Sequence, residues 1–331
     1  MSMGIPGGVL IVGEMATDGA LRPVSLELAT AGRGLANRLG APLTALVMGS
    51  GIGAAAAVLA GVGVDRVLAV DDPRLAALNA ELSARAVAAA IDAAQPAIVL
   101  FPGTTAGHDS APKVAARLGA PLVSDALALA LDGGRLVAIR AVLGGRAQTE
   151  LRLNGTPQLA TVRAGSFTPA AAAASSGDIV PLAVEFTPSD FRVSVGETET
   201  KGGGATRLDI AEVVVSGGRG LKEPNNFKLV EELAELLGGA VGATRAVVDA
   251  GWRPHAEQIG QTGRTVAPKL YVAVGISGAV QHNVGMQGSG AIVAINRDPD
   301  APIFKIAQFG IVGDLFEVAP ALANELRAGR G

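Results

Sequence analysis

Residues 258–296 read QIGQTGRTVAPKLYVAVGISGAVQHNVGMQGSGAIVAIN, and this stretch indicates the fold of the C-terminal part of the chain. Its centre is the short apolar run 270–274, which ends in the small residues Gly275-Ile276-Ser277-Gly278. A short apolar run stopped by small residues is typical of a buried parallel strand that leads into a helix. We therefore expect a parallel sheet here, with backbone that approaches a ligand closely at Gly275 and Gly278. The amides of the following helix would face a phosphate.

Strands and helices alternate over the first 120 residues. Apolar runs predict strands at 8–13, 43–49, 66–70 and 97–101, and helical spacing predicts helices at 25–39, 54–60, 75–94 and 110–118. Such alternation predicts a parallel sheet with helices on both faces. Shorter runs at 136–139 and 158–162, with turns at Asp132-Gly133-Gly134 and Asn154-Gly155, predict antiparallel additions to this sheet.

A chain of 331 residues is long enough for two domains, and the stretch 193–208 marks the expected boundary between them. It is rich in glycine and threonine and has lost its periodicity. We expect an N-terminal α/β domain at 1–200 and a doubly wound α/β domain at 205–331. The second series of elements predicts strands at 211–215, 245–248, 270–274 and 291–295, and helices at 226–237 and 315–327.

The composition excludes several classes of function. Hydrophobic residues make up 49% of the chain and charged residues 17%, which suits a packed globular protein. A net charge of −3 argues against nucleic-acid binding, which needs a clustered basic surface. There is no cysteine, and the three histidines are scattered, so we expect neither a disulfide framework nor a metal site.

Two uncharged stretches are long enough to span a membrane. They are 39–64 and, apart from His282, 270–296. Each has a Gly/Ser cluster near its middle and a short β-rich run beside it, so we interpret both as strand–turn–helix units, not as membrane spans. The N-terminus lacks the basic region and apolar core of a signal peptide, and a cytoplasmic protein is expected.

The first domain contains a competing motif. Gly51-Ile52-Gly53-Ala54-Ala55-Ala56 fits the dinucleotide fingerprint G-x-G-x-x-A, and Asp71 follows Gly51 by 20 residues. This pattern supports an alternative function as an NAD-dependent dehydrogenase, although the motif follows the second strand of its domain and no acid–base group accompanies it. A non-catalytic nucleotide-binding module is a further alternative. Both predict a protein without flavin.

Several short motifs together resemble the alpha subunit of the electron transfer flavoproteins. Those of the second domain lie at 216–221, 242–251, 260–263, 275–282, 294–296, 301–304 and 314–316. Phe101-Pro102-Gly103-Thr104-Thr105-Ala106-Gly107 and Val123-Ser124-Asp125 extend the resemblance over nearly the whole chain. The sequence departs from the family pattern at 222–226, 252–253, Asn283 and Gln287, which we expect at the rim of the site.

The resemblance implies that the second domain binds FAD and that three residues tune its redox behaviour. Arg245 would lie beside the isoalloxazine ring and stabilise its anionic forms, although the residues alone leave open an ion pair with Asp249. Thr262 would donate a hydrogen bond to the flavin N5. His282 would donate to the pyrimidine carbonyl, with a positive charge if it is protonated; standing alone it would be a surface histidine.

The remaining members of the implied site follow the carboxyl ends of the expected strands, where ligands of open α/β sheets bind. Arg219 would grip the dinucleotide, and Ser277 and Gly278 would bind the pyrophosphate. The full set implied to contact the cofactor is Arg219, Thr244, Arg245, Ile259, Gly260, Gln261, Thr262, Ser277, Gly278, Ala279, Val280, Gln281, His282, Asn296, Asp314 and Leu315.

The resemblance also implies a function and partners. The chain would be an electron carrier without a substrate-transforming reaction of its own, paired in a heterodimer with an AMP-binding beta subunit. Acyl-CoA dehydrogenases and other flavin dehydrogenases would supply electrons, and electron transfer flavoprotein:quinone oxidoreductase would receive them. The match favours the non-bifurcating type of the family.

Overall fold

The computed structural model describes residues 7–16, 18–143, 147–174, 176–196, 208 and 211–328. The chain divides into two compact units, Met1–Thr198 and Glu199–Gly331, here called unit 1 and unit 2. Each is an α/β domain, as the sequence predicts. The glycines at 202–204, in the expected boundary, lie outside the described residues.

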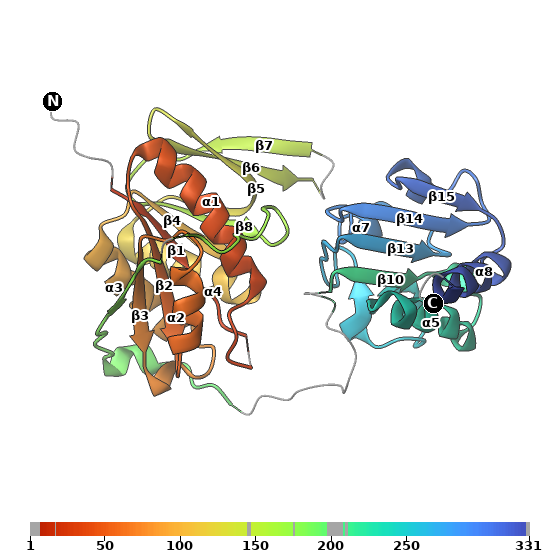
Figure 1. Cartoon of the computed structure of the whole chain (residues 1–331), viewed down its shortest axis with the longest axis horizontal. Helices are drawn as coiled ribbons and strands as arrows, with labels where there is room; N and C mark the ends of the chain where they lie inside the picture. The colour runs from red at the N-terminus through yellow and green to blue at the C-terminus, as the bar shows by residue number, and fades with distance from the viewer. Residues whose placement is uncertain are drawn as a thin grey trace. The chain divides into compact units, whose positions relative to one another are not determined.

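Unit 1 is built on a sheet of nine described strands in the order β7-β6-β5-β8-β4-β1-β2-β3-β9 (Figure 1). The strands are β1 Val9–Val12, β2 Leu43–Gly49, β3 Arg66–Asp71, β4 Ile98–Gly103, β5 Leu122–Asp132, β6 Arg135–Val142, β7 Ala147–Arg152, β8 Gln158–Arg163 and β9 Asp178–Pro181. Its helices are α1 Pro23–Leu39, α2 Gly53–Ala60, α3 Ala80–Ala94 and α4 Thr105–Leu118.

The helices of unit 1 cover both faces of its sheet. Leu28 of α1 and Leu59 of α2 lie in one buried cluster, and Val87 of α3 and Val114 of α4 lie in the other. Successive side chains of a strand point to opposite faces of the sheet, so the apolar residues of one strand contribute to both clusters. The expected antiparallel additions are present as β6 and β7. The same expectation was wrong for β8, which pairs in parallel with β4 and β5 and is buried between them.

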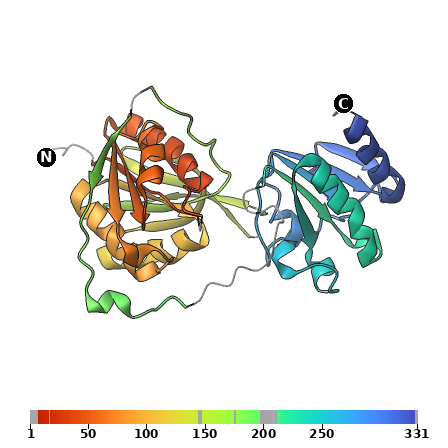
Figure 2. The ribbon, with the colours of Figure 1, turned by 60° about the horizontal axis from the view of Figure 1, so that its bottom comes forward.

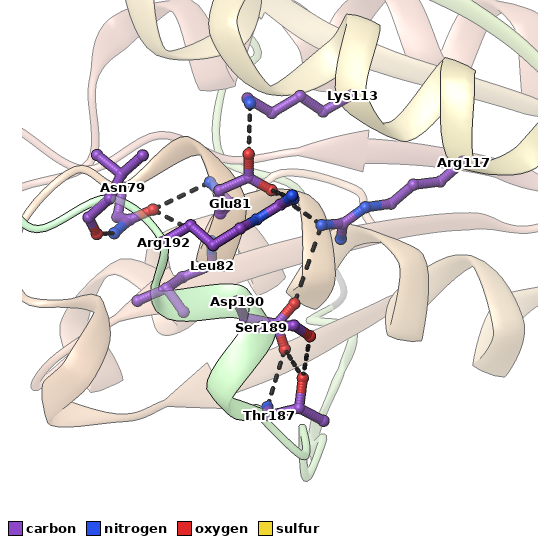
Figure 3. A network of polar contacts seen from close by, with 10 residues as sticks. Asn79, Glu81, Leu82, Lys113, Arg117, Thr187, Ser189, Asp190 and Arg192 are labelled. Atoms are coloured by element: carbon purple, nitrogen blue, oxygen red, sulfur yellow. Dashed lines mark hydrogen bonds and ion pairs between the residues drawn. The ribbon is translucent and has the colours of Figure 1, made fainter.

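Residues 182–196 follow β9 and pack on α3 and α4; we call them the strap. Leu182, Val184 and Phe186 contact the buried cluster under these helices. Figure 3 shows the polar network that fastens the strap. Glu81 of α3 pairs with Lys113 at 2.6 Å, Arg117 at 3.0 Å and Arg192 of the strap at 3.7 Å.

Other bonds support the same attachment. Asn79 caps α3 and donates from Nδ2 to the Val193 carbonyl at 2.9 Å, and Arg117 lies 3.9 Å from Asp190. The hydrogen bond from Lys113 lowers the pKa of Glu81, which therefore stays ionised between the cations. One carboxylate thus joins two helices to the strap.

Replacing Glu81→Ala should release the strap, because Lys113 and Arg117 then repel Arg192 with no carboxylate between them. We expect tryptic cleavage after Arg192 to accelerate about five-fold, corresponding to about 1 kcal/mol of easier local opening. Mass spectrometry of timed digests measures this rate. Glu150→Ala, which changes an exposed glutamate of β7, is the matched control; equal rates for both variants would contradict the role of Glu81.

Unit 2 contains six described strands, all parallel, in the order β12-β11-β10-β13-β14-β15. The strands are β10 Val213–Gly217, β11 Ala240–Thr244, β12 Gln258–Ile259, β13 Leu270–Val274, β14 Ala291–Asn296 and β15 Phe309–Val312. The helices are α5 Lys228–Leu237, α6 Arg245–Val248, α7 Val280–Asn283 and α8 Leu315–Ala328. This is the doubly wound order expected from the sequence.

The two faces of this sheet are covered differently. Helices α5 and α8 lie on the same face, as Figure 2 shows in teal and dark blue, and bury Leu233 and Ala319 there. Residues of loops and of a short 3-10 helix, such as Val266, Met286 and Ile303, cover the other face. None of the helices in the described part of the chain has the length and apolar character that a membrane crossing requires.

One strand prediction in unit 2 was wrong. Residues 245–248 form helix α6, and the strand before it, β11, ends at Thr244. The adjacent valines favour a strand locally. Tertiary packing overrides that preference, because a helical turn beyond the sheet edge buries Val247 in the core.

Candidate functional site

The strand order of unit 2 reverses between β10 and β13, and this is the position at which open α/β sheets bind ligands. Gly217 at the end of β10 lies opposite Val274 at the end of β13. The loops that leave these strands therefore begin side by side, at the carboxyl edge of the sheet. Most of the residues expected in the site follow the ends of the six strands at this same edge.

The two loops touch through their backbones. The Gly218 amide donates to the Val274 carbonyl at 2.9 Å, and the Gly220 amide donates to the Gly275 carbonyl at 3.0 Å. A Cβ atom on Gly218 would lie 2.3 Å from the Gly275 oxygen, and one on Gly220 would lie 2.7 Å from the Gly275 Cα. Only glycine fits this crossing, and Gly275 also has a left-handed φ of +64°.

Replacing Gly275→Ala should destabilise unit 2 by about 2 to 4 kcal/mol, through left-handed strain and overlap with Gly220. Trp252 is the single tryptophan of the chain, so its fluorescence reports urea unfolding of unit 2. In the control Gly288→Ala, the new Cβ atom meets only the Ala267 side chain at 3.6 Å. An unfolding midpoint for Gly275→Ala as high as that of the control would show that the crossing tolerates a side chain.

Beyond Gly275 the chain offers a row of backbone amides to a ligand. Within the described part of the chain, the amides of residues 276–281 donate no hydrogen bond to any carbonyl or side chain. Two carbonyls of the same segment accept hydrogen bonds from a neighbouring part of unit 2. Ile303 N donates to Ser277 O at 3.0 Å, and Asn296 Nδ2 donates to Ile276 O at 2.9 Å. Unpaired amides in a glycine turn at a switch point suit a phosphate group.

The helix expected after this turn is short. Helix α7 has only four residues, Val280–Asn283. A long helix dipole is therefore not available at the turn, and its attraction for an anion must come from the individual amide groups.

The loop 259–263 interlocks with the segment 278–285. The Gln261 amide donates to the Gln281 carbonyl at 2.7 Å. A Cβ atom on Gly285 would lie 2.4 Å from the Gly260 nitrogen, so the two backbones are in direct contact. Gly260 has a φ of +140°, which favours glycine at this position. The segments after β12 and β13 thus form one rigid wall of the site.

The buried side chain of His282 joins the two segments of this wall. It is 6% exposed; Nδ1 lies 3.1 Å from the Ile259 carbonyl and Nε2 lies 3.0 Å from the Tyr271 hydroxyl. A carbonyl can only accept, so Nδ1 must carry the proton and Nε2 of the neutral ring accepts from Tyr271. Burial raises the pKa of Tyr271, which keeps its hydroxyl protonated as the donor.

This environment differs from the one expected for His282. The ring is not at the surface, and both nitrogens are engaged within the protein. Burial lowers its pKa to about 4, while the bond to the Ile259 carbonyl acts in the opposite direction, so the ring is neutral near pH 7. A hydrogen bond from Nε2 to a flavin carbonyl requires the bond from Tyr271 to break and Nε2 to carry a hydrogen, either by protonation of the ring or by a change of tautomer that gives up the bond to Ile259.

The buried imidazole makes the stability of unit 2 depend on pH. The pKa of His282 is about 4 in the folded chain against 6.5 in the unfolded chain. Between these values the unfolded chain binds the extra proton, so His282 lowers the free energy of unfolding as the pH falls from 6.5 towards 4, by up to roughly 3 kcal/mol. Above pH 6.5 this residue adds no pH dependence.

Urea unfolding followed by Trp252 fluorescence tests this effect. His282→Gln should unfold more easily at pH 7, because it lacks the bonds to Ile259 and Tyr271, and should lose less stability than wild type between pH 6.5 and 4. Parallel pH profiles for the two proteins would show that the imidazole is not held neutral.

The exposed members of the site include the polar residues Arg219, Arg245, Gln261, Thr262 and Ser277. The Arg219 guanidinium has no partner among the described residues and is available to an anion. The Arg245 side chain is 65% exposed and lies 3.2 Å from Asp249, so the ion pair left open by the sequence is present. The guanidinium is not buried, and its exposed ion pair with Asp249 is weak enough to yield to a ligand.

Three expected members of the site make contacts within unit 2 in this structure. Asn296 holds the Ile276 carbonyl, as described above. Asp314 Oδ1 accepts from the Phe316 amide at 3.0 Å at the start of α8. Leu315 is buried in the core beside Gly275. Their direct contacts with a cofactor stay predictions.

Two departures from the family pattern have bonds of their own within unit 2. Arg253 binds Glu231 of α5 at 2.5 Å and Glu257 at 2.6 Å, and its guanidinium lies over the Phe227 ring. Asn283 donates from Nδ2 to the Gly278 carbonyl at 2.9 Å. Both therefore fix loops of the site.

The competing motif in unit 1 folds in a way that opposes dinucleotide binding. The Gly51 amide donates to Asp71 Oδ1 at 2.7 Å, so the acid that would bind a ribose caps the glycine loop itself. The switch point of this sheet lies between β1 and β4, where Glu14 bonds with Thr104 and pairs with Arg22 at 2.8 Å. A carboxylate at that point repels phosphate.

Comparison with known proteins assigns the family. The family model "Electron transfer flavoprotein domain" matches residues 9–187, and "Electron transfer flavoprotein FAD-binding domain" matches residues 207–287. The chain belongs to the electron transfer flavoprotein alpha-subunit family.

Relatives from several bacteria match almost end to end. The chain is 40% identical to electron transfer flavoprotein subunit alpha of Thermoanaerobacterium thermosaccharolyticum over 94% of this chain and 95% of the relative. It is 40% identical to that of Bacillus subtilis, over 96% and 97%. For the subunit of Mycobacterium tuberculosis the identity is 41%, over 98% and 99%.

FAD is the cofactor of unit 2, and the residues present fit it. The amides of residues 276–281 beside the glycine crossing are unpaired, which suits a pyrophosphate, and the Arg219 guanidinium adds a positive charge. The interlocked loop presents the Thr262 hydroxyl at the same edge. The described residues contain no cluster of His, Asp or Glu that could hold a metal ion.

Two residues with clear structural roles were missed from the sequence. Tyr271 is fully buried and completes the His282 bonds, and Gln258 donates to Thr262. Tyr271 is the only tyrosine of the chain and the one hydroxyl in an otherwise apolar strand, a signal that pointed to a buried partner.

Proposed function

We propose that this chain holds FAD in a heterodimeric electron carrier and transforms no substrate of its own. The observation that supports this most is the row of unpaired amides and the glycine crossing at the switch point of a family-assigned FAD-binding domain. Bound FAD supplies one- and two-electron redox chemistry. The described residues around it provide binding, orientation and charge.

In this proposal each part of the edge has a separate task. Amides 276–281 and Arg219 bind the pyrophosphate. The Thr262 hydroxyl donates to the flavin N5, and the Arg245 guanidinium leaves Asp249 to stabilise negative charge on the reduced ring. His282, kept neutral by burial and bonded to the Ile259 carbonyl, keeps the loop 259–262 in place.

The proposed partners follow from the family. An AMP-binding beta subunit completes the heterodimer, acyl-CoA dehydrogenases and other flavin dehydrogenases donate electrons, and electron transfer flavoprotein:quinone oxidoreductase accepts them. We place the complex in the cytoplasm and in the non-bifurcating type. Fatty acid β-oxidation is then the process that it serves.

An absorption spectrum of the chain, co-purified with a candidate beta subunit, tests the proposal. A yellow complex with flavin bands that bleach reversibly on stepwise reduction is expected. A colourless protein that binds NAD would favour the dehydrogenase, with its site at Gly51, Gly53 and Asp71.

Arg245→Ala should lower the flavin reduction potential, because the reduced ring loses a nearby positive charge. Loss of about 1 kcal/mol corresponds to about 40 mV per electron. Reductive titration against a dye of known potential measures it. Arg264→Ala, which removes an exposed arginine that bonds to the Ala256 carbonyl, is the control; an equal shift in both variants would refute a specific role for Arg245.

A further inference from the structure

Gln258 begins β12 and is held firmly beside the site. It is 3% exposed, and its backbone pairs with Ala243 of β11. Its carbonyl accepts from the Arg264 amide at 2.7 Å. Both ends of the peptide are therefore fixed, and the side chain has little freedom to turn away from its partner.

That partner is the Thr262 hydroxyl. Gln258 Nε2 lies 3.0 Å from Thr262 Oγ1. An amide nitrogen can only donate, so the hydroxyl oxygen accepts and its own hydrogen is left for another group. Thr262 is exposed, and no acceptor for that hydrogen exists among the described residues. The hydroxyl is thus set as a donor towards the carboxyl edge of the sheet.

The bond is not needed to close the loop. The Gly260 amide donates to the Arg264 carbonyl at 3.1 Å, and the Gly263 amide donates to the Gly260 carbonyl at 3.0 Å. Together with the Gln261–Gln281 bond, these contacts hold the turn through backbone groups alone. The Gln258 side chain adds only one constraint, which is the direction of the Thr262 hydroxyl hydrogen.

We propose that Gln258 is a positioning residue that fixes Thr262 as a hydrogen-bond donor to the bound ligand. The complementary ligand group is an acceptor without a proton, such as the N5 atom or the neighbouring carbonyl of an oxidised flavin ring. This inference rests on the proposed function, because that function places the ring at Thr262. An acceptor in place of the Gln258 amide would turn the hydrogen inward and leave the ligand facing lone pairs.

The test uses the complex with its beta subunit, reconstituted with FAD labelled with ¹⁵N at N5. Gln258→Met removes the donor, and Gln258→Glu at alkaline pH replaces it with an acceptor of equal size. We expect the N5 resonance to move downfield in both, because N5 loses its hydrogen-bond donor, with the larger move in Gln258→Glu. The dissociation constant for FAD should rise about five- to ten-fold.

A double-mutant cycle separates positioning from general damage. In a Thr262→Val background, Gln258→Met should leave the N5 resonance unchanged, because the group through which Gln258 acts is gone. Gln308→Met is the structural control: Gln308 Oε1 accepts from the Ile292 amide at 2.7 Å, so its loss should lower the melting temperature without moving the N5 resonance.

The outcomes distinguish the two claims. A complex that binds FAD while Gln258→Met and Gln258→Glu leave N5 in place overturns the inference alone. Equal shifts with and without Thr262 show that Gln258 acts through the fold, which also overturns it. A wild-type complex without FAD overturns the proposed function, and the inference falls with it.

Discussion

Backbone contact between the loops after β10 and β13 is the constraint on which the site depends. Gly218 and Gly220 lie against Gly275 at distances that exclude any Cβ atom. Because the loops cross so closely, the chain turns sharply after β13, its carbonyls are taken up by Asn296 and Ile303, and its next six amides remain unpaired. The anion-binding character of the edge is therefore a consequence of close backbone packing, without a long helix behind it.

The buried polar chain from Tyr271 through His282 to the Ile259 carbonyl holds the second half of the site. Each of these groups has its hydrogen-bonding capacity directed by the next, which fixes one tautomer and one ring orientation. The exposed groups, Arg219, Arg245 and Thr262, are then free to meet a ligand at little cost in rearrangement. A hydrogen-bonded interior wall, with two exposed guanidinium groups and a directed hydroxyl beside it, suits repeated reduction and oxidation of a bound ring.

Much of this fold could be predicted from the sequence, because buried parallel strands such as 270–274 leave continuous apolar runs bounded by glycine. The short strand β12 and the helix α6 could not, since two residues show no periodicity and Val247-Val248 favours a strand locally. Motifs also bring most of the expected site residues to one edge of the sheet, where its strands end. They could not show that His282 and Asn296 point into the protein, because side-chain direction depends on contacts between segments far apart in sequence.

Hydrogen exchange with mass spectrometry, on the complex with and without FAD, tests the central claim directly, because it reads the amides themselves. We expect FAD to slow exchange in peptides covering residues 276–281 and to leave exchange in residues 49–71 of unit 1 unchanged. Unprotected amides at 276–281 in a complex that holds FAD, or protection confined to 49–71, would contradict it.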